Sequence, residues 1–155
     1  MMGDASLGNL QRRGALPAIL AGGLTAGTID LLQACLLFGW DIPLAIAGGL
    51  VGPRAFVGGV GFYALGIALH YFIALSAASI YYAVSRRLRF LAENWLVCGL
   101  FFGAAVDLVM TLAVLPLSAL HARGPYELKD LIQGLLVHMV VVGLPIAFFV
   151  RRLGR

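Results

Sequence analysis

Four long apolar blocks alternate with short polar connections along the chain. The blocks cover about 15–39, 57–84, 96–119 and 131–150. Each is at least as long as the ~20 residues that an α-helix needs to cross the hydrocarbon core of a bilayer. Because a lipid-exposed segment must satisfy its own backbone hydrogen bonds, helices are the expected elements. The pattern predicts an all-α membrane protein, a four-transmembrane-helix bundle that forms one domain over residues 1–155.

The first connection differs from the other two because it is itself apolar. Asp41-Ile42-Pro43 follows the first block and ends its helix, and Gly52-Pro53-Arg54 stands just before the second block. Residues 44–51 between them are apolar but far too short to span a bilayer. We expect a short helix that lies at the outer membrane surface, or a shallow re-entrant segment.

Composition supports the membrane prediction. Hydrophobic residues make up 61% of the 155 residues and charged residues only 12%. A soluble domain is closer to half apolar and a quarter charged. A water-soluble fold of this length has too few polar residues to cover so much apolar surface. The composition therefore excludes a soluble enzyme or binding domain.

The positive charges are distributed unevenly between the two sides of the predicted bundle. Eight basic residues fall on the side of the two ends and the middle connection, and three fall on the other side. The eight are Arg12, Arg13, Arg86, Arg87, Arg89, Arg151, Arg152 and Arg155; the three are Arg54, Arg123 and Lys129. Cytoplasmic loops carry the excess of basic residues, so both termini are expected in the cytoplasm. The net charge of +4 therefore indicates topology, and no nucleic-acid partner is expected.

The first block has to be compared with a cleaved signal. Leu32-Gln33-Ala34-Cys35 loosely resembles the end of a lipoprotein signal. Asp30 interrupts the apolar run, however, and apolar sequence continues past Cys35 through Phe38. We therefore expect the first helix to be retained.

The two halves of the chain carry a similar order of residues. Each half has a GxxxG pair, an aspartate, a connection, a GxxxH pair and two arginines. In the first half these are Gly23, Gly27, Asp30, Gly66, His70, Arg86 and Arg87; in the second they are Gly99, Gly103, Asp107, Gly134, His138, Arg151 and Arg152. The final glycine precedes the aspartate by three positions in one half and by four in the other, so the match is imperfect. Both halves run in the same direction, which predicts a parallel two-hairpin repeat.

Each block carries one ionisable residue close to its midpoint: Asp30, His70, Asp107 and His138. A charged side chain at the membrane centre costs at least ~2.5–3.5 kcal/mol. We therefore expect the four groups to face the bundle interior and to satisfy one another. In a closed cyclic bundle the two histidine helices lie diagonally, with an aspartate helix on either side of each.

Three interpretations of this intramembrane polar cluster remain open. In the first, Asp–His hydrogen bonds lock the bundle together. In the second, His70 and His138 bind haem b as a pair of axial ligands, or the four residues bind a transition metal. Gly66 and Gly134, one helical turn before each histidine, would then leave room for a porphyrin face. In the third, the cluster forms a proton or small-solute path.

Three further features have local roles. The GxxxG pairs predict close contact between helix backbones. Pro145 is expected to kink the fourth helix on the cytoplasmic side of His138. Tyr71 adjoins His70 and is expected to belong to the polar cluster. No sequence motif of a soluble enzyme is present, so catalytic residues are not predicted.

The chain resembles a group of uncharacterised bacterial membrane proteins. The stretches that carry the likeness are 27–30 with its continuation to Trp40-Asp41, 64–82 around His70, 115–118, and 134–152 around His138. More distantly, the order of elements is similar to that of the YagU-like inner-membrane proteins, which are longer. The resemblance implies a bacterial inner-membrane location and a four-helix fold, and it supplies no activity or cofactor.

These observations predict a non-enzymatic inner-membrane protein whose polar cluster is structural or binds a small ligand. Its partners are the lipid bilayer and either a second copy of the chain or a larger membrane complex, in which it is an accessory subunit. The alternatives are a haem-b electron carrier that uses His70 and His138, and a small proton-linked transporter.

Overall fold

The computed structural model describes residues 4–122, 124 and 127–154, and these residues are almost entirely helical. The elements are α1 (Asp4–Phe38), α2 (Ile42–Val51), η1 (Gly52–Val57), α3 (Val60–Arg87), α4 (Phe90–Glu93), α5 (Trp95–Val109), η2 (Met110–Val114), α6 (Leu115–Leu117), α7 (Leu128–Val137), η3 (His138–Gly143) and α8 (Leu144–Leu153).

Four helical stretches are long and apolar enough to cross a bilayer. They are Gly14–Phe38, Val60–Arg87, Trp95–Leu117 and Leu128–Leu153. Their limits lie within three residues of those expected from the hydrophobic pattern. The prediction of an all-α protein with four transmembrane helices is confirmed, and the chain is a membrane protein.

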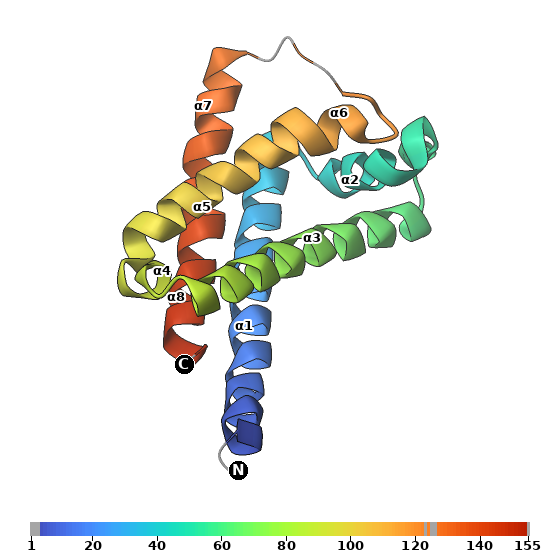
Figure 1. The fold of residues 1–155 in the computed structure, drawn as a ribbon. Coiled ribbons are helices and arrows are strands. Elements are labelled where there is room, and N and C mark those ends of the chain that lie inside the picture. The colour runs from blue at the N-terminus through green and yellow to red at the C-terminus, as the bar shows by residue number, and fades with distance from the viewer. Residues whose placement is uncertain (1–3, 123, 125–126, 155) are drawn as a thin grey trace.

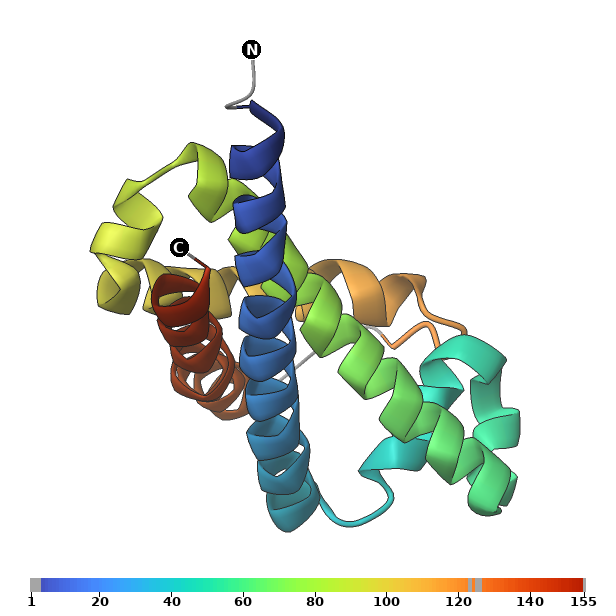
Figure 2. The same cartoon turned by 90° about the horizontal axis from the view of Figure 1, so that it is seen from below.

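The spans are arranged around the pair formed by α1 and α8. These two helices lie side by side, and the two ends of the chain lie at the same end of this pair (Figure 1). α3 packs across α1 and carries its N-terminal half away from the pair to meet α2 (Figure 2). α5 packs on η3 and α8 on the other side. The order around the bundle is therefore α3, α1, α8 and α5.

The ring of helices is closed only where the Tyr81 ring of α3 meets the Phe102 ring of α5, with centroids 4.9 Å apart, which corrects one expectation from the sequence. Along most of their length α3 and α5 are separated by an apolar groove of about 310 Å³. The helix α3 contacts α8 instead. The helix of His70 therefore packs closely against one aspartate helix, α1, and not against the other, α5. Small residues on α1 and α8 allow these two helices to pack close together.

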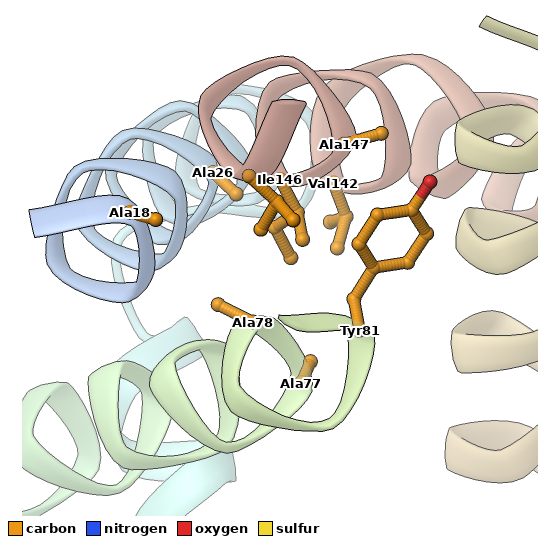
Figure 3. Close-up of a cluster of buried hydrophobic side chains, with 9 residues drawn as sticks. Ala18, Ala26, Ala77, Ala78, Tyr81, Val142, Ile146 and Ala147 are labelled. Carbon is orange, nitrogen blue, oxygen red and sulfur yellow. The ribbon is translucent and has the colours of Figure 1, made fainter. Parts of the chain in front are cut away.

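A hydrophobic core joins three of the spans. α1 contributes Ala18 and Ala26, and α3 contributes Ala77, Ala78 and Tyr81 (Figure 3). The fourth span contributes Val142, Ile146, Ala147 and Val150. Most of these side chains are small, which is typical of membrane helices whose backbones approach closely. Many other large apolar side chains are exposed, as expected for a surface that faces lipid.

The first connection contains the expected short helix, α2, followed by the 3₁₀ turn η1. Pro43 stands in the first turn of α2, where a missing N–H costs nothing. Gly58 and Gly59 separate η1 from α3 with φ of +87° and +107°, a backbone conformation that favours glycine. The backbone of Pro43 packs directly onto Gly66 of α3, so α2 is held against the bundle.

The third and fourth spans each contain a π-helical segment, and each segment precedes a proline. The segment η2 ends two residues before Pro116, and η3 ends two residues before Pro145. Proline lacks the N–H that would bond to the carbonyl four residues back, and its ring clashes with that carbonyl. Widening of the preceding turn relieves the clash. In the fourth span the expected irregularity at Pro145 thus takes the form of a π-segment that begins at His138.

Contacts between the connections group them at the two ends of the bundle. At one end, the Ala119 N–H donates to the Gly49 carbonyl at 2.8 Å, which joins the first connection to the third. At the other end, Arg86 donates to the Gly154 carbonyl at 3.3 Å, which joins the end of α3 to the end of α8. This grouping places the C-terminus beside the middle connection, as the charge distribution requires.

Candidate functional site: an intramembrane Asp–His centre

The first hairpin holds one Asp–His pair, formed between α1 and α3. His70 Nε2 donates a hydrogen bond to the Gly27 carbonyl at 2.8 Å, which requires the proton to be on Nε2. Asp30 Oδ2 lies 3.9 Å from the same nitrogen. This separation is too long for a hydrogen bond, so the carboxylate acts on the imidazole through space. The His70 ring is thus fixed mainly by the backbone of α1.

A second polar contact joins the same two helices one residue further along. The hydroxyl groups of Tyr71 and Thr28 lie 2.9 Å apart. The Tyr71 ring meets the His70 ring edge-on, with centroids 5.8 Å apart. Tyr71 therefore lies beside the His70 ring, and its hydroxyl bonds to the exposed Thr28.

The second hairpin holds the other Asp–His pair, formed between α5 and the start of η3. His138 Nδ1 donates to the Gly134 carbonyl at 2.9 Å and lies 3.1 Å from Asp107 Oδ1. The Asp107 side chain is only 9% exposed. The Asp–His distance is shorter than in the first pair, and Asp107 is more buried than Asp30, whereas His138 is more exposed than His70. The proton on Nδ1 leaves Nε2 of a neutral His138 ring as an acceptor.

Glycines bring the two helices of each hairpin together in a partly shared register. Gly27 lies against Ala74 and Tyr71, four and one positions after His70, and Gly103 lies against His138 and Met139. A β-carbon added at Gly103 would clash with the His138 carbonyl.

One turn back, the first glycine of each pair also lies against its histidine helix. Gly23 faces Leu75, and Gly99 faces Gly143, each five positions after the histidine. The equivalent placement of both glycine pairs supports the two-hairpin repeat. It also shows why the Asp and His of each hairpin meet: the GxxxG face sets the distance between their helices.

Three of the four ionisable residues line one small cavity between the hairpins. Asp30, His70 and His138 all face it, and its volume is about 80 Å³. Asp107 does not line this cavity, but it lies 3.1 Å from His138, which does. The structure therefore brings together groups from the first, second and fourth spans, and it connects the third span through His138.

The cavity adjoins the groove between α3 and α5. Four residues line both spaces, and they are Ile73, Ala77, Val106 and Met110. The groove itself is lined almost wholly by apolar side chains and faces the surrounding lipid. The polar centre is thus separated from the bilayer by a single layer of side chains on this side.

The geometry does not fit haem between His70 and His138. A site for a ligand of this size needs several hundred Å³, and the cavity offers about 80 Å³. The space expected above two glycines is also filled. Backbone atoms of Pro43 lie against Gly66, and a β-carbon at Gly134 would lie 3.1 Å from Asp107 Oδ1. These contacts leave no room for a porphyrin face at Gly66 and little at Gly134.

The geometry also does not gather the four residues around one metal ion. Within the described part of the chain, no three histidine, cysteine, aspartate or glutamate side chains converge closely enough to hold a metal. Asp30 lies nearest to His70, and Asp107 lies nearest to His138. The groups form two pairs rather than one ligand set.

The sequence pattern did not reveal the π-segments that flank the centre. His138 is the first residue of η3, and η2 begins three residues after Asp107. Such segments are rare in proteins and occur frequently at functional sites. The one feature of the sequence that could have indicated the π-segments is the pair of prolines, Pro116 and Pro145, that follow them.

No protein-family model, curated protein or solved structure matches the chain. The likeness to YagU-like membrane proteins therefore stays a prediction.

Proposed function

We propose that the chain is a non-enzymatic membrane protein whose two Asp–His pairs hold the two hairpins together and border a small polar binding site. One observation carries this proposal. Asp30, His70 and His138, which come from three different spans, line a single cavity near the middle of those spans. Groups that only tied helices together would have no need to face a common space.

The size of the cavity limits what can bind there. Each molecule of liquid water occupies about 30 Å³, and a buried water needs two to four polar partners. A cavity of about 80 Å³ with two imidazoles and a carboxylate on its walls meets both conditions for a small water cluster. The proposed ligand is therefore water together with the protons that water carries, rather than an organic molecule.

The location that we propose is the bacterial inner membrane, with both ends of the chain in the cytoplasm. Eight of the eleven basic residues in the sequence support this orientation. The contact of Arg86 with the Gly154 carbonyl supports it further, because it puts the middle connection and the C-terminus at the same end.

Nuclear magnetic resonance of ¹⁵N-labelled histidine tests the proposal, because the chain has only three histidines. We expect the proton of neutral His70 on Nε2 and that of neutral His138 on Nδ1, as their backbone acceptors require. We also expect exchange cross-peaks between water and both rings. Ala77→Leu should weaken these cross-peaks, since Ala77 lines the cavity.

Two internal controls belong to this measurement. His121 is exposed and should exchange with water in every variant. Ser76→Leu adds a similar side chain next to Ala77 but in the groove alone, so it should leave the cross-peaks unchanged. The proposal would be contradicted if neither the His70 ring nor the His138 ring of the unmodified protein showed water exchange. It would also be contradicted by a proton on Nδ1 of neutral His70 or on Nε2 of neutral His138.

A proton-linked transporter is the second candidate, and the π-segments favour it. The segment η3 begins at His138 and η2 follows Asp107, so the backbone next to the polar pair departs from regular α-helix. Chains of buried carboxylates and histidines commonly serve as proton relays in membranes.

For the transporter, Asp30→Asn should abolish a pH-driven flux in liposomes while leaving assembly intact. The reason is that asparagine keeps the shape of the side chain but does not exchange a proton. Asp41→Asn, in the connection before α2, is the matched control and should transport normally. Equal flux in the Asp30→Asn and unmodified proteins would end this candidate.

A further inference from the structure

The end of the bundle that holds the C-terminus carries an arginine-lined pocket that is separate from the Asp–His centre. The pocket has a volume of about 530 Å³ and lies between the end of α3, α4 and the end of α8. We call it the arginine pocket. Its lining residues with charged side chains are Arg86, Arg89, Glu93 and Arg151.

The arginines come from two segments that are distant in the sequence and are held near each other by specific contacts. Arg86 donates to the Gly154 carbonyl at 3.3 Å, which fastens the end of α3 to the end of α8. The Arg151 guanidinium lies 5.8 Å from the centre of the Trp95 ring, a cation–π distance. Trp95 begins α5, so Arg151 connects the arginine pocket to the third span.

A second pocket adjoins the first and shares Arg151 with it. Its volume is about 480 Å³, and it is lined by Trp95, Phe148, Arg151 and Arg152. The Trp95 and Phe148 rings pack edge-on with centroids 5.6 Å apart. This second pocket therefore has an aromatic wall beside two guanidinium groups.

Among the described residues that line the arginine pocket, positive charge exceeds negative charge. Three arginines face one glutamate, and among the described residues none of these arginines forms an ion pair with a carboxylate. The carbonyl groups at the ends of α3 and α8 offset part of this charge. An anion with several acceptor oxygens would satisfy the guanidinium groups better than water does.

We propose that the arginine pocket binds the phosphate group of an anionic phospholipid, whose acyl chains then lie along the apolar surface of the spans. The pocket lies where the apolar helices end and the basic residues begin, which is the depth of lipid headgroups. Basic pockets between transmembrane helices at this depth suit anionic headgroups. The aromatic wall of the adjoining pocket provides apolar contact that a free phosphate ion does not use.

The two tryptophans of the chain allow a direct test. Trp95 lines the second pocket, which adjoins the arginine pocket, whereas Trp40 lies in the connection that follows α1. A Trp40→Phe variant in mild detergent therefore reports from Trp95 alone. Brominated phosphatidylglycerol should quench Trp95 at a lower mole fraction than equally brominated phosphatidylcholine.

Arginine substitutions separate a site from a general preference for anionic lipid. Arg86→Gln and Arg89→Gln should each reduce the preference about fivefold, the effect expected for one arginine near a charged membrane surface. Arg86→Lys should keep most of it, because the charge remains. Arg54→Gln, at the far end of the bundle, is the matched control and should have no effect.

Three results would overturn the proposal. The first is equal quenching of Trp95 by the two brominated lipids, and the second is a preference for phosphatidylglycerol that the Arg86→Gln and Arg89→Gln variants both retain. The third is release of phosphatidylglycerol quenching by millimolar inorganic phosphate where the same concentration of chloride has no effect, which would identify a soluble phosphate as the ligand.

Discussion

Gly103→Ala is expected to destabilise the protein by about 2–3 kcal/mol, at the upper end of the range for overpacked sites. The added methyl group would clash with the carbonyl of His138 and come within 2.6 Å of the Met139 Cα. Backbone atoms of a packed helix do not move aside as the end of a flexible side chain does. The helices α5 and η3 must therefore separate, and the contact between Asp107 and His138 lengthens with them.

Reversible unfolding in detergent or in bicelles measures this effect, and Gly61→Ala is its control. Gly61 lies near the start of α3, and nothing lies within 4 Å of the position of its added methyl group. Glycine is a poor residue within a helix, so Gly61→Ala should be neutral or stabilising by up to about 1 kcal/mol. Equal stability of the Gly103→Ala and Gly61→Ala variants would show that α5 and η3 are not in close contact.

Asp107→Ala is expected to have the second largest effect, a loss of about 1–2 kcal/mol from the packed bundle. Polar contacts between membrane helices average about 0.6 kcal/mol and reach about 1.7 kcal/mol. The Asp107 contact should lie at the upper end because the side chain is 9% exposed and its oxygen lies 3.1 Å from His138 Nδ1. Asp30→Ala should cost less, since Asp30 lies 3.9 Å from His70.

The measurement has to separate packing from insertion. Removal of an aspartate from the middle of a span makes insertion of that helix more favourable, because the charge is costly in lipid. The loss predicted for Asp107→Ala therefore concerns the association of helices already in the membrane. Steric trapping of the inserted protein measures the free energy of that association. If Asp107→Ala lost no more association free energy than Asp30→Ala, the result would contradict the shorter contact of Asp107 with its histidine.

Much of the fold follows from the hydrophobic pattern. Four apolar blocks of sufficient length determine four spanning helices, because lipid leaves the backbone no other way to satisfy its hydrogen bonds. Residues 44–51 were too short to span, and they form most of α2. Counting along the blocks predicts that Asp30, His70, Asp107 and His138 lie at a similar depth, since a helix rises by a constant amount per residue.

The features that the pattern did not predict depend on packing between helices. Whether α3 closes against α5 is decided by the shapes of both surfaces, and a one-dimensional pattern does not contain them. Gly66 is a second example of what the sequence pattern does not contain. The sequence shows that this position has no side chain, but the space left there can accommodate either a cofactor or the backbone of a neighbouring helix. In the structure it receives Pro43 of α2.

The prolines show how a local signal can be ambiguous. Pro17 lies within α1, which continues as an α-helix from Asp4 to Phe38. Pro116 and Pro145 instead follow π-helical segments. The same residue type therefore has different consequences in different spans. In the second hairpin a π-segment lies next to each member of the Asp107–His138 pair.

The central claim is that each aspartate pairs with the histidine of its own hairpin. A double-mutant cycle on the association of the inserted helices tests it most directly, because coupling energy reports contact between two side chains. Alanine substitutions of Asp107 and His138 should be coupled by about 0.6 kcal/mol or more. Substitutions of Asp107 and His70 should be additive within about 0.3–0.5 kcal/mol. Additive effects for Asp107 and His138, with coupling between Asp107 and His70, would contradict the account.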